Sequence, residues 1–102
     1  MYSMNYNKKF EGIWIPRSIW YASELTPLEK VILCEIHYLD NEDHCYASNA
    51  YLAELCCCSE NKVSKAVNKL LKLGYISLIS FDGRNRVISS NMEFDVTVAK
   101  RI

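Results

Sequence analysis

The chain has 102 residues, of which 50% are hydrophobic and 24% are charged. This composition provides enough apolar side chains for one folded core and excludes a chain that is disordered throughout. No apolar run reaches the ~18–20 residues that a membrane-spanning helix needs, and the polar start lacks the apolar segment of a secretory signal. We therefore expect one cytoplasmic domain without a membrane partner.

The formal net charge of zero hides an uneven distribution of charge along the chain. Residues 1–59 hold 4 basic and 8 acidic side chains, whereas residues 60–90 hold 6 basic and 2 acidic ones. The second segment therefore has a local charge of +4. An asymmetry of this kind favours a polyanionic partner.

A long helix is predicted to begin after Thr26. This residue can cap the helix, Pro27 suits the first helical position, and Glu29 completes a capping box. Apolar residues then recur with the period of a helix that buries one face, namely Leu28, Val31, Ile32, Ile36 and Leu39. The polar residues 40–43 predict a turn after the helix.

Two further helices follow with a short connection between them. Ser48 is a good N-cap for a short helix that ends at Leu55 or Cys56, and Ser59 offers another N-cap only three residues later. The pattern stays helical until Gly74, which suits the left-handed residue beyond a helix end. Two helices joined so closely predict a helix-turn-helix.

The sequence after Gly74 changes to a β pattern. Residues 75–81 are β-branched and aromatic, residues 82–85 predict a turn, and residues 86–88 return to β character. Upstream, residues 12–16 are a strand candidate, followed by a turn of helix through Trp20. We predict an α+β winged helix-turn-helix over residues 10–90, with a three-helix core and a C-terminal β-hairpin wing. Residues 1–9 are an N-terminal tail, and residues 91–102 are a C-terminal tail or the start of a further segment.

Several segments of the chain also resemble a known family: residues 12–16, 26–30, 47–53, 59–64 and 70–76. They look like the N-terminal domain of phage and plasmid replication-initiation (replisome-organiser) proteins, and bacterial transcription regulators share the helix-turn-helix pattern. The resemblance implies that the partner is double-stranded DNA. It also implies a role in replication initiation or transcription regulation, in a phage or another mobile element.

The helix after Ser59 holds most of the candidate DNA-binding residues. If its core face takes Val63, Ala66, Val67 and Leu70, the other face collects Asn61, Lys62, Ser64, Lys65, Asn68, Lys69 and Lys72. Asn pairs with adenine, and Lys reaches the guanine edge. Because recognition helices read bases with their N-terminal part, we expect Asn61, Lys62, Ser64 and Lys65 to read bases, and Lys69 and Lys72 to contact phosphates. The alternative is a lysine-rich face that contacts only water.

The predicted wing and the helix cap add three candidates. Arg84 and Arg86 lie where a wing meets the minor groove or a phosphate, although charges at a hairpin tip also protect a sheet edge from aggregation. Ser59 is expected to cap the helix, and its hydroxyl is a candidate phosphate contact. If four to six basic residues neutralise phosphates, log affinity should fall with log salt at a slope of roughly −4 to −5.

The five cysteines lack the paired spacing of a zinc site, so we predict no metal and no cofactor. Cys57 falls where relatives of the motif often have glycine, at a position that requires a left-handed backbone. A redox switch at Cys56, Cys57 and Cys58 is an alternative to reduced apolar cysteines. No catalytic triad, phosphate-binding glycine loop or paired acids occur, so we do not expect an enzyme.

Two alternatives to simple DNA binding stay open. The first is a protein-interaction winged helix that docks a replication or transcription component. The second is a homodimeric, ligand-sensing or redox-sensing repressor, for which Trp14, Trp20 and Tyr21 supply either core or dimer surface.

Overall fold

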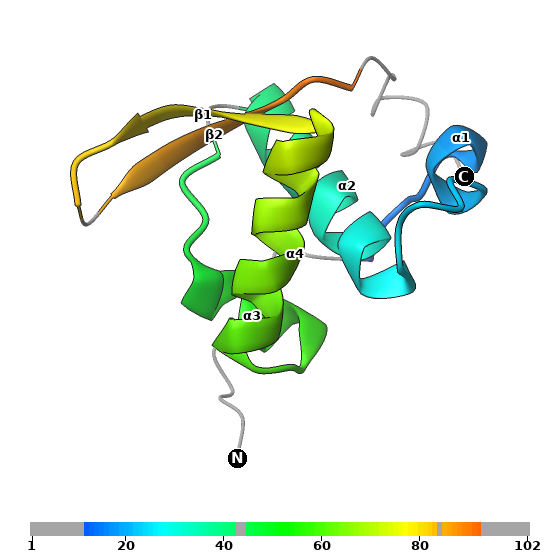
Figure 1. Cartoon of the computed structure of the whole chain (residues 1–102), viewed down its shortest axis with the longest axis horizontal. Helices are drawn as coiled ribbons and strands as arrows, with labels where there is room; N and C mark the ends of the chain where they lie inside the picture. Colours follow the sequence, from blue (N-terminus) through cyan, green and yellow to red (C-terminus); the bar gives the residue numbers. More distant parts are fainter. Residues whose placement is uncertain (1–11, 43–44, 84, 93–102) are drawn as a thin grey trace.

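The computed structural model describes residues 12–42, 45–83 and 85–92. Four helices precede an antiparallel hairpin: α1 (Arg17–Trp20), α2 (Pro27–Glu42), α3 (Asn49–Cys56), α4 (Glu60–Leu73), β1 (Ile76–Phe81) and β2 (Arg86–Ser90). Helices α2, α3 and α4 form the body, and the hairpin extends from it as a wing (Figure 1). The fold is an α+β winged helix-turn-helix, as predicted.

Helix α2 begins at the predicted capping box. The Thr26 N–H donates to Glu29 Oε1 at 2.8 Å, and the Glu29 N–H donates to Thr26 Oγ1 at 3.3 Å. Each side chain thus satisfies a backbone donor at the helix start. The face of α2 that follows contributes Ile32, Leu33 and Ile36 to the core, and none of the three is exposed to solvent.

Helices α3 and α4 form the predicted helix-turn-helix. The Ser48 side chain accepts from the Tyr51 N–H at 3.0 Å, and the Ser59 side chain accepts from the Lys62 N–H at 3.2 Å. Cys57 lies in the turn with φ 56° and ψ 45°, which is the left-handed conformation expected there. Gly74 ends α4 with φ 87° and ψ 10°.

The wing is a two-stranded antiparallel sheet whose base is packed into the body. Ile76 lies opposite Ser90, Leu78 opposite Ile88 and Phe81 opposite Arg86, and the register shifts at a bulge between Leu78 and Ser80. The strand β2 also pairs with Cys45, which precedes α3, through an isolated bridge at Ile88. Ile76 and Ile88 are 2% and 1% exposed, so the first residue of β1 and the middle of β2 lie in the core.

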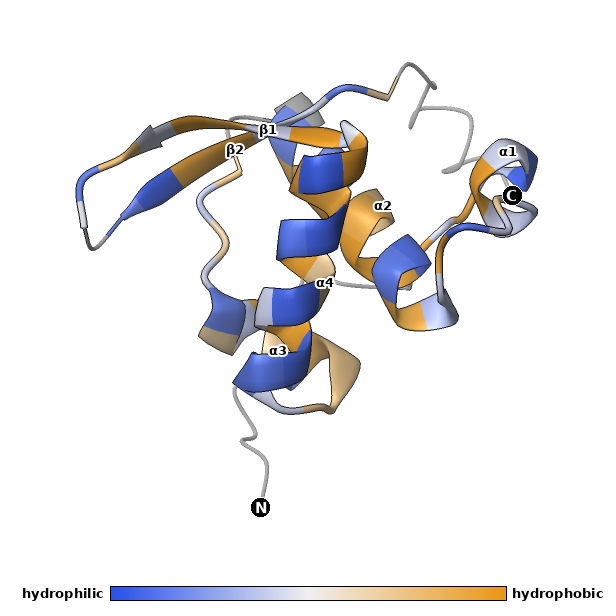
Figure 2. Ribbon diagram, viewed as in Figure 1, coloured by the Kyte–Doolittle hydropathy of each residue, from blue (hydrophilic) through white to orange (hydrophobic). Residues whose placement is uncertain are grey.

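The core lies where the inner faces of the helices meet the base of the wing, as the hydropathy colouring shows (Figure 2). Two polar groups inside it link elements. Glu35 of α2 accepts from the Tyr51 hydroxyl of α3 at 2.8 Å, and His37 Nδ1 is hydrogen bonded to Ser90 Oγ of β2 at 2.8 Å. Hydrogen bonding compensates for the burial of such groups and fixes the relative positions of the elements.

Two predictions are wrong. Residues 40–43 are predicted to form a turn, but α2 continues through Asp40 and Asn41 to Glu42. Residues 12–16 form no strand, and within the part of the chain that the structure describes no strand pairs with them. Instead, Ile13 and Ile15 pack against the core. The predicted tails lie outside the described residues, apart from positions 91 and 92. Among the helices described, none has the length and apolarity needed to span a membrane.

Candidate nucleic-acid interface

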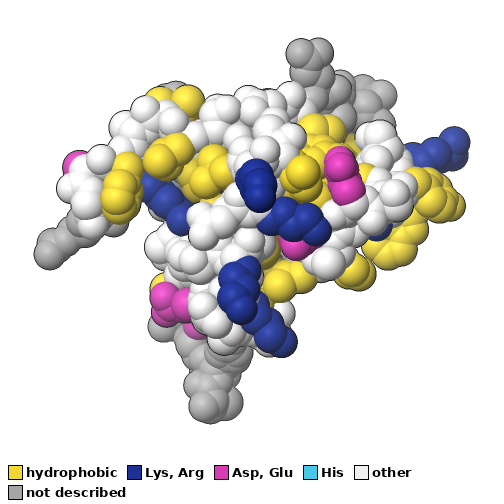
Figure 3. All heavy atoms as spheres, viewed as in Figure 1, with side chains coloured by type: hydrophobic (Ala, Val, Ile, Leu, Met, Phe, Trp, Pro, Cys, Tyr) yellow, Lys and Arg dark blue, Asp and Glu magenta, His cyan; other side chains and the backbone are white. Residues whose placement is uncertain are grey.

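The outward face of α4 carries the predicted contact residues. Val63, Ala66, Val67 and Leu70 are buried, which directs the polar positions between them to the surface. Asn61, Lys62, Lys65, Asn68 and Lys72 are exposed, and Ser64 and Lys69 are half-buried. Lys62, Lys65, Lys69 and Lys72 are spaced at three or four residues and therefore share one side of the helix. A row of basic side chains runs along this part of the molecule (Figure 3).

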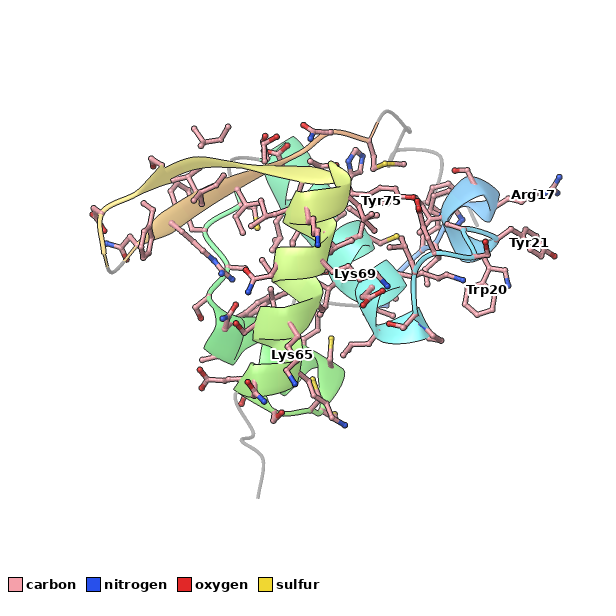
Figure 4. All side chains as sticks on the ribbon, viewed as in Figure 1. Arg17, Trp20, Tyr21, Lys65, Lys69 and Tyr75 are labelled. Atoms are coloured by element: carbon pink, nitrogen blue, oxygen red, sulfur yellow. The ribbon has the colours of Figure 1, made fainter. Side chains whose placement is uncertain are left out.

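Lys69 differs from the other lysines because it forms an ion pair with the body. Its Nζ lies 3.0 Å from Glu29 Oε1 of α2, and it extends from α4 toward that helix (Figure 4). Burial raises the pKa of Glu29, but the Thr26 N–H and Lys69 outweigh this effect, so the pKa lies below its usual value. Lys69 therefore offers less free charge than Lys62, Lys65 or Lys72.

Ser59 stands at the N-terminus of α4, and its Oγ caps the helix. The residue is exposed, and it lies at the helix end where partial positive charge and free N–H groups favour an anion. The predicted capping role is confirmed, and the phosphate contact stays a prediction.

Arg86 turns back toward the body. Its Nε and Nη2 donate to the Ala47 carbonyl at 3.3 and 3.2 Å, and Nη2 donates to Asn49 Oδ1 at 2.6 Å. Burial lowers the pKa of this guanidinium, but an arginine in a protein stays charged. These bonds tie the wing to the start of α3, a role that the sequence pattern did not reveal. Arg84 lies outside the described residues.

The sequence left open whether Trp20 and Tyr21 lie in the core or on the surface, and the structure places both on the surface. Trp20 and Tyr21 are 50% and 75% exposed and project from the α1 end of the molecule (Figure 4). The Lys30 ammonium lies 5.0 Å from the centre of the Trp20 ring, within cation–π range. On the wing, Leu78, Ile79 and Phe81 are 48%, 61% and 61% exposed. Their alternation signals a strand but does not show how far the strand extends beyond the core.

A family model described as a helix-turn-helix domain matches residues 23–76, just over half of the chain. The chain belongs to this helix-turn-helix domain family. The match covers α2, α3 and α4 and ends at the first residue of β1. No curated protein and no solved structure matches the chain significantly.

Membership in the helix-turn-helix family supports DNA as a partner of this chain. In such domains the second helix of the motif enters the major groove, and here that helix is α4. Among the described residues, no cluster of three or more His, Cys, Asp or Glu side chains is suited to hold a metal ion.

Proposed function

We propose that this helix-turn-helix protein binds double-stranded DNA in a sequence-specific manner, with α4 in the major groove. The observation that carries the proposal is the polar face of α4, where Lys62, Lys65 and Lys72 and the asparagines are exposed on a helix whose opposite face is buried in the core. The opposite ends of this face serve different purposes. Asn61, Lys62, Ser64 and Lys65 lie near the N-terminus and suit base edges.

The remaining polar residues of this face suit the DNA backbone. Lys72 is exposed at the far end of α4, and Lys69 has hydrogens beyond the one directed at Glu29. Asn68 lies between them, and Ser59 stands at the helix start. In this proposal Arg86 holds the wing in place. Arg84 contacts the minor groove or a phosphate, as predicted from its position in the sequence.

The biological setting that we propose is replication initiation or transcription regulation in a phage or plasmid, in the cytoplasm, where the free cysteines stay reduced. A homodimer or a complex with a replication protein is compatible with the exposed Trp20 and Tyr21. Support for the setting comes from the sequence resemblance, whereas support for DNA binding comes from the family and from the charge of α4.

Selection of bound duplexes from a random pool tests the proposal directly. We expect enrichment of one sequence, and symmetric half-sites in it would indicate a dimer. Failure to enrich any duplex, together with stable capture of a replication or transcription protein, would instead support a protein-docking winged helix.

Two lysine variants then distinguish a contact to a base edge from a contact to a phosphate. If Lys65 reads a base, Lys65→Ala should lower the ratio of the affinity for the selected duplex to the affinity for a scrambled duplex by roughly 5- to 100-fold. Lys72→Ala should weaken binding to both duplexes equally. Equal losses on both duplexes for both variants would show that Lys65 does not read a base.

A further inference from the structure

The three consecutive cysteines between α3 and α4 lie in two different environments. Cys57 is exposed, whereas Cys56 and Cys58 are half-buried and pack against the core. All three are free thiols in the structure. The first and third cysteines of this turn therefore lie against the interior, and the second faces solvent.

The backbone at Cys57 brings its two neighbours close together. Its torsion angles, φ 56° and ψ 45°, are those of a left-handed helical residue. From the radius and rise of a helix of either hand, such a residue separates the Cα atoms before and after it by about 5.4 Å. Disulfides join residues whose Cα atoms lie roughly 4.4–6.8 Å apart. Cys56 and Cys58 therefore already have the Cα separation of a disulfide.

Two hydrogen bonds hold the backbone in this conformation. The Cys57 N–H donates to the Glu54 carbonyl at 3.3 Å, and the Cys58 N–H donates to the Ala53 carbonyl at 3.0 Å. These are the two bonds of a Schellman motif, which satisfies the last carbonyls of a helix. The end of α3 thus fixes the separation of Cys56 and Cys58 before any reaction takes place.

The remaining cysteines of the chain are poorly suited to thiol chemistry. Cys34 and Cys45 are 2% and 0% exposed. Burial raises the pKa of Cys34 to about 12 and also raises the pKa of Cys45. Because the thiolate is the reactive form, neither is a good nucleophile. Burial likewise raises the pKa of Cys56 to about 11, so Cys56 suits the second step of an exchange better than the first.

We propose that Cys56 and Cys58 form a reversible dithiol–disulfide site whose co-reactant is a low-molecular-weight disulfide, and that oxidation of this site weakens DNA binding. The Cys58 thiolate attacks one sulfur of the small disulfide, which forms a mixed disulfide and releases a thiolate. The Cys56 thiolate then attacks the Cys58 sulfur, and the second small thiol leaves. The protein loses two protons and two electrons, and the small disulfide is reduced to two thiols.

The effect on DNA binding follows from the position of the pair. Cys58 directly precedes Ser59, which caps α4. A disulfide requires the two Cβ atoms to approach to about 3.5–4.5 Å, so its closure constrains the residue before the cap and shifts the start of α4. The base-reading residues that we propose lie in this first part of the helix. This half of the inference rests on the proposed function, whereas the disulfide itself does not.

Mass spectrometry tests the pairing of the cysteines. The protein is incubated with oxidised glutathione, the free thiols are alkylated, and the peptides are mapped. We expect the loss of two hydrogens and the protection of Cys56 and Cys58 from alkylation. Cys57→Ser should keep the disulfide, whereas Cys56→Ser and Cys58→Ser, which make the same chemical change, should lose it. A glutathione that stays on Cys57, or a disulfide that requires Cys57, overturns the proposal.

Titration of a labelled duplex with reduced and oxidised protein tests the effect on binding. Oxidation should weaken binding by about tenfold, the equivalent of one good base contact, and dithiothreitol should restore it. Cys58→Ser should bind equally well with and without oxidised glutathione. Thermal unfolding checks that the oxidised protein stays folded, and an oxidised protein that unfolds would contradict a reversible switch.

The outcomes distinguish this inference from the proposed function. If the disulfide forms and the duplex affinity stays the same, the effect on DNA binding is wrong and the dithiol site stands. If the reduced protein binds no duplex, the proposed function fails, and the mass spectrum still decides whether Cys56 and Cys58 pair. If neither thiol is protected by oxidised glutathione, the inference fails and the proposed function is untouched.

Discussion

Cys57 occupies the one left-handed non-glycine position among the described residues, with φ 56° and ψ 45°. A side chain with a Cβ adopts this conformation at a cost of roughly 1–2 kcal/mol, which glycine avoids. Glycine also gains freedom in the unfolded chain, which offsets part of the benefit. We expect Cys57→Gly to raise the free energy of unfolding by about 0.5–1 kcal/mol in urea denaturation.

Cys57→Ala is the control for this substitution. It removes the thiol and keeps the Cβ, so it should leave the stability close to that of the unaltered protein. An equal gain from both variants would mean that the thiol, and not the backbone conformation, lowers the stability of the turn.

Glu35 is 3% exposed on α2, where the Tyr51 hydroxyl donates to its Oε2 at 2.8 Å. Burial raises the pKa of Glu35, and the hydrogen bond from Tyr51 only partly opposes this. The folded protein therefore holds the proton more tightly than the unfolded chain. Its ionisation costs stability as the pH rises through the raised pKa, and this cost is absent below the usual value near 4.5.

Because ionisation of Glu35 costs stability, Glu35→Gln should be more stable than the unaltered protein at pH 7. The amide is neutral, and its oxygen still accepts from the Tyr51 hydroxyl. The difference in unfolding free energy should shrink as the pH falls from the raised pKa toward about 4.5, and it should be absent below that pH. Urea unfolding at several pH values measures it. A deficit for Glu35→Gln that is constant over this range would contradict the expected cost of ionisation.

At the scale of the element, α4 depends on Ser59 for its N-terminus. Ser59→Ala should lower the free energy of unfolding by about 1 kcal/mol, because it leaves the Lys62 N–H without the cap. Ser59→Asp keeps a capping oxygen and places a negative charge at a favourable helix end. It should therefore remain stable, while DNA affinity falls because the carboxylate repels phosphate.

Ser59→Asn separates charge from shape, since it has nearly the same size as Asp, caps equally well and is neutral. It should retain both stability and DNA affinity. Equal DNA affinity of Ser59→Asp and Ser59→Asn, measured by titration of a labelled duplex, would show that this helix end lies away from phosphates.

The elements themselves could be predicted from local sequence signals. The caps at Thr26, Ser48 and Ser59 mark the starts of α2, α3 and α4, and Gly74 marks the end of α4, because capping depends on neighbours in the chain. The end of α2 has no such signal and lies three residues beyond the predicted one. The bonds of Arg86 and the ion pair of Lys69 could not be predicted. They join residues about 40 positions apart, and no local pattern encodes such a contact. Residues 12–16 show the same limit, because a strand requires a partner.

At the scale of the whole molecule, the basic charge facing DNA is smaller than the sequence count suggests. Arg86 is bonded to the body, and Lys69 is paired with Glu29. If Lys62, Lys65 and Lys72 alone supply the positive charge that meets DNA, the slope of log affinity against log salt should be about −3. The slope of roughly −4 to −5 expected from composition would require further basic residues to take part.

The Lys69–Glu29 pair makes a related prediction. Glu29→Gln can still complete the capping box and frees Lys69, so duplex affinity should rise and the salt slope should become steeper by up to about 1. Glu24→Gln is the control, because Glu24 accepts from the Tyr75 hydroxyl and lies beside no lysine of α4 in the contacts seen. Equal gains from both variants would assign the effect to net charge alone.

The second strand of the wing, β2, is hydrogen bonded to α2 through Ser90. Ser90 Oγ is bonded to His37, and the Ser90 N–H donates to Asp40 Oδ2 at 3.1 Å. Together with the Arg86 bonds to the start of α3, this holds β2 at both of its ends. The distance between the wing and α4 is thereby preset before any DNA arrives. If both α4 and the wing contact DNA, one base pair inserted between the positions that they contact should separate those positions and weaken binding.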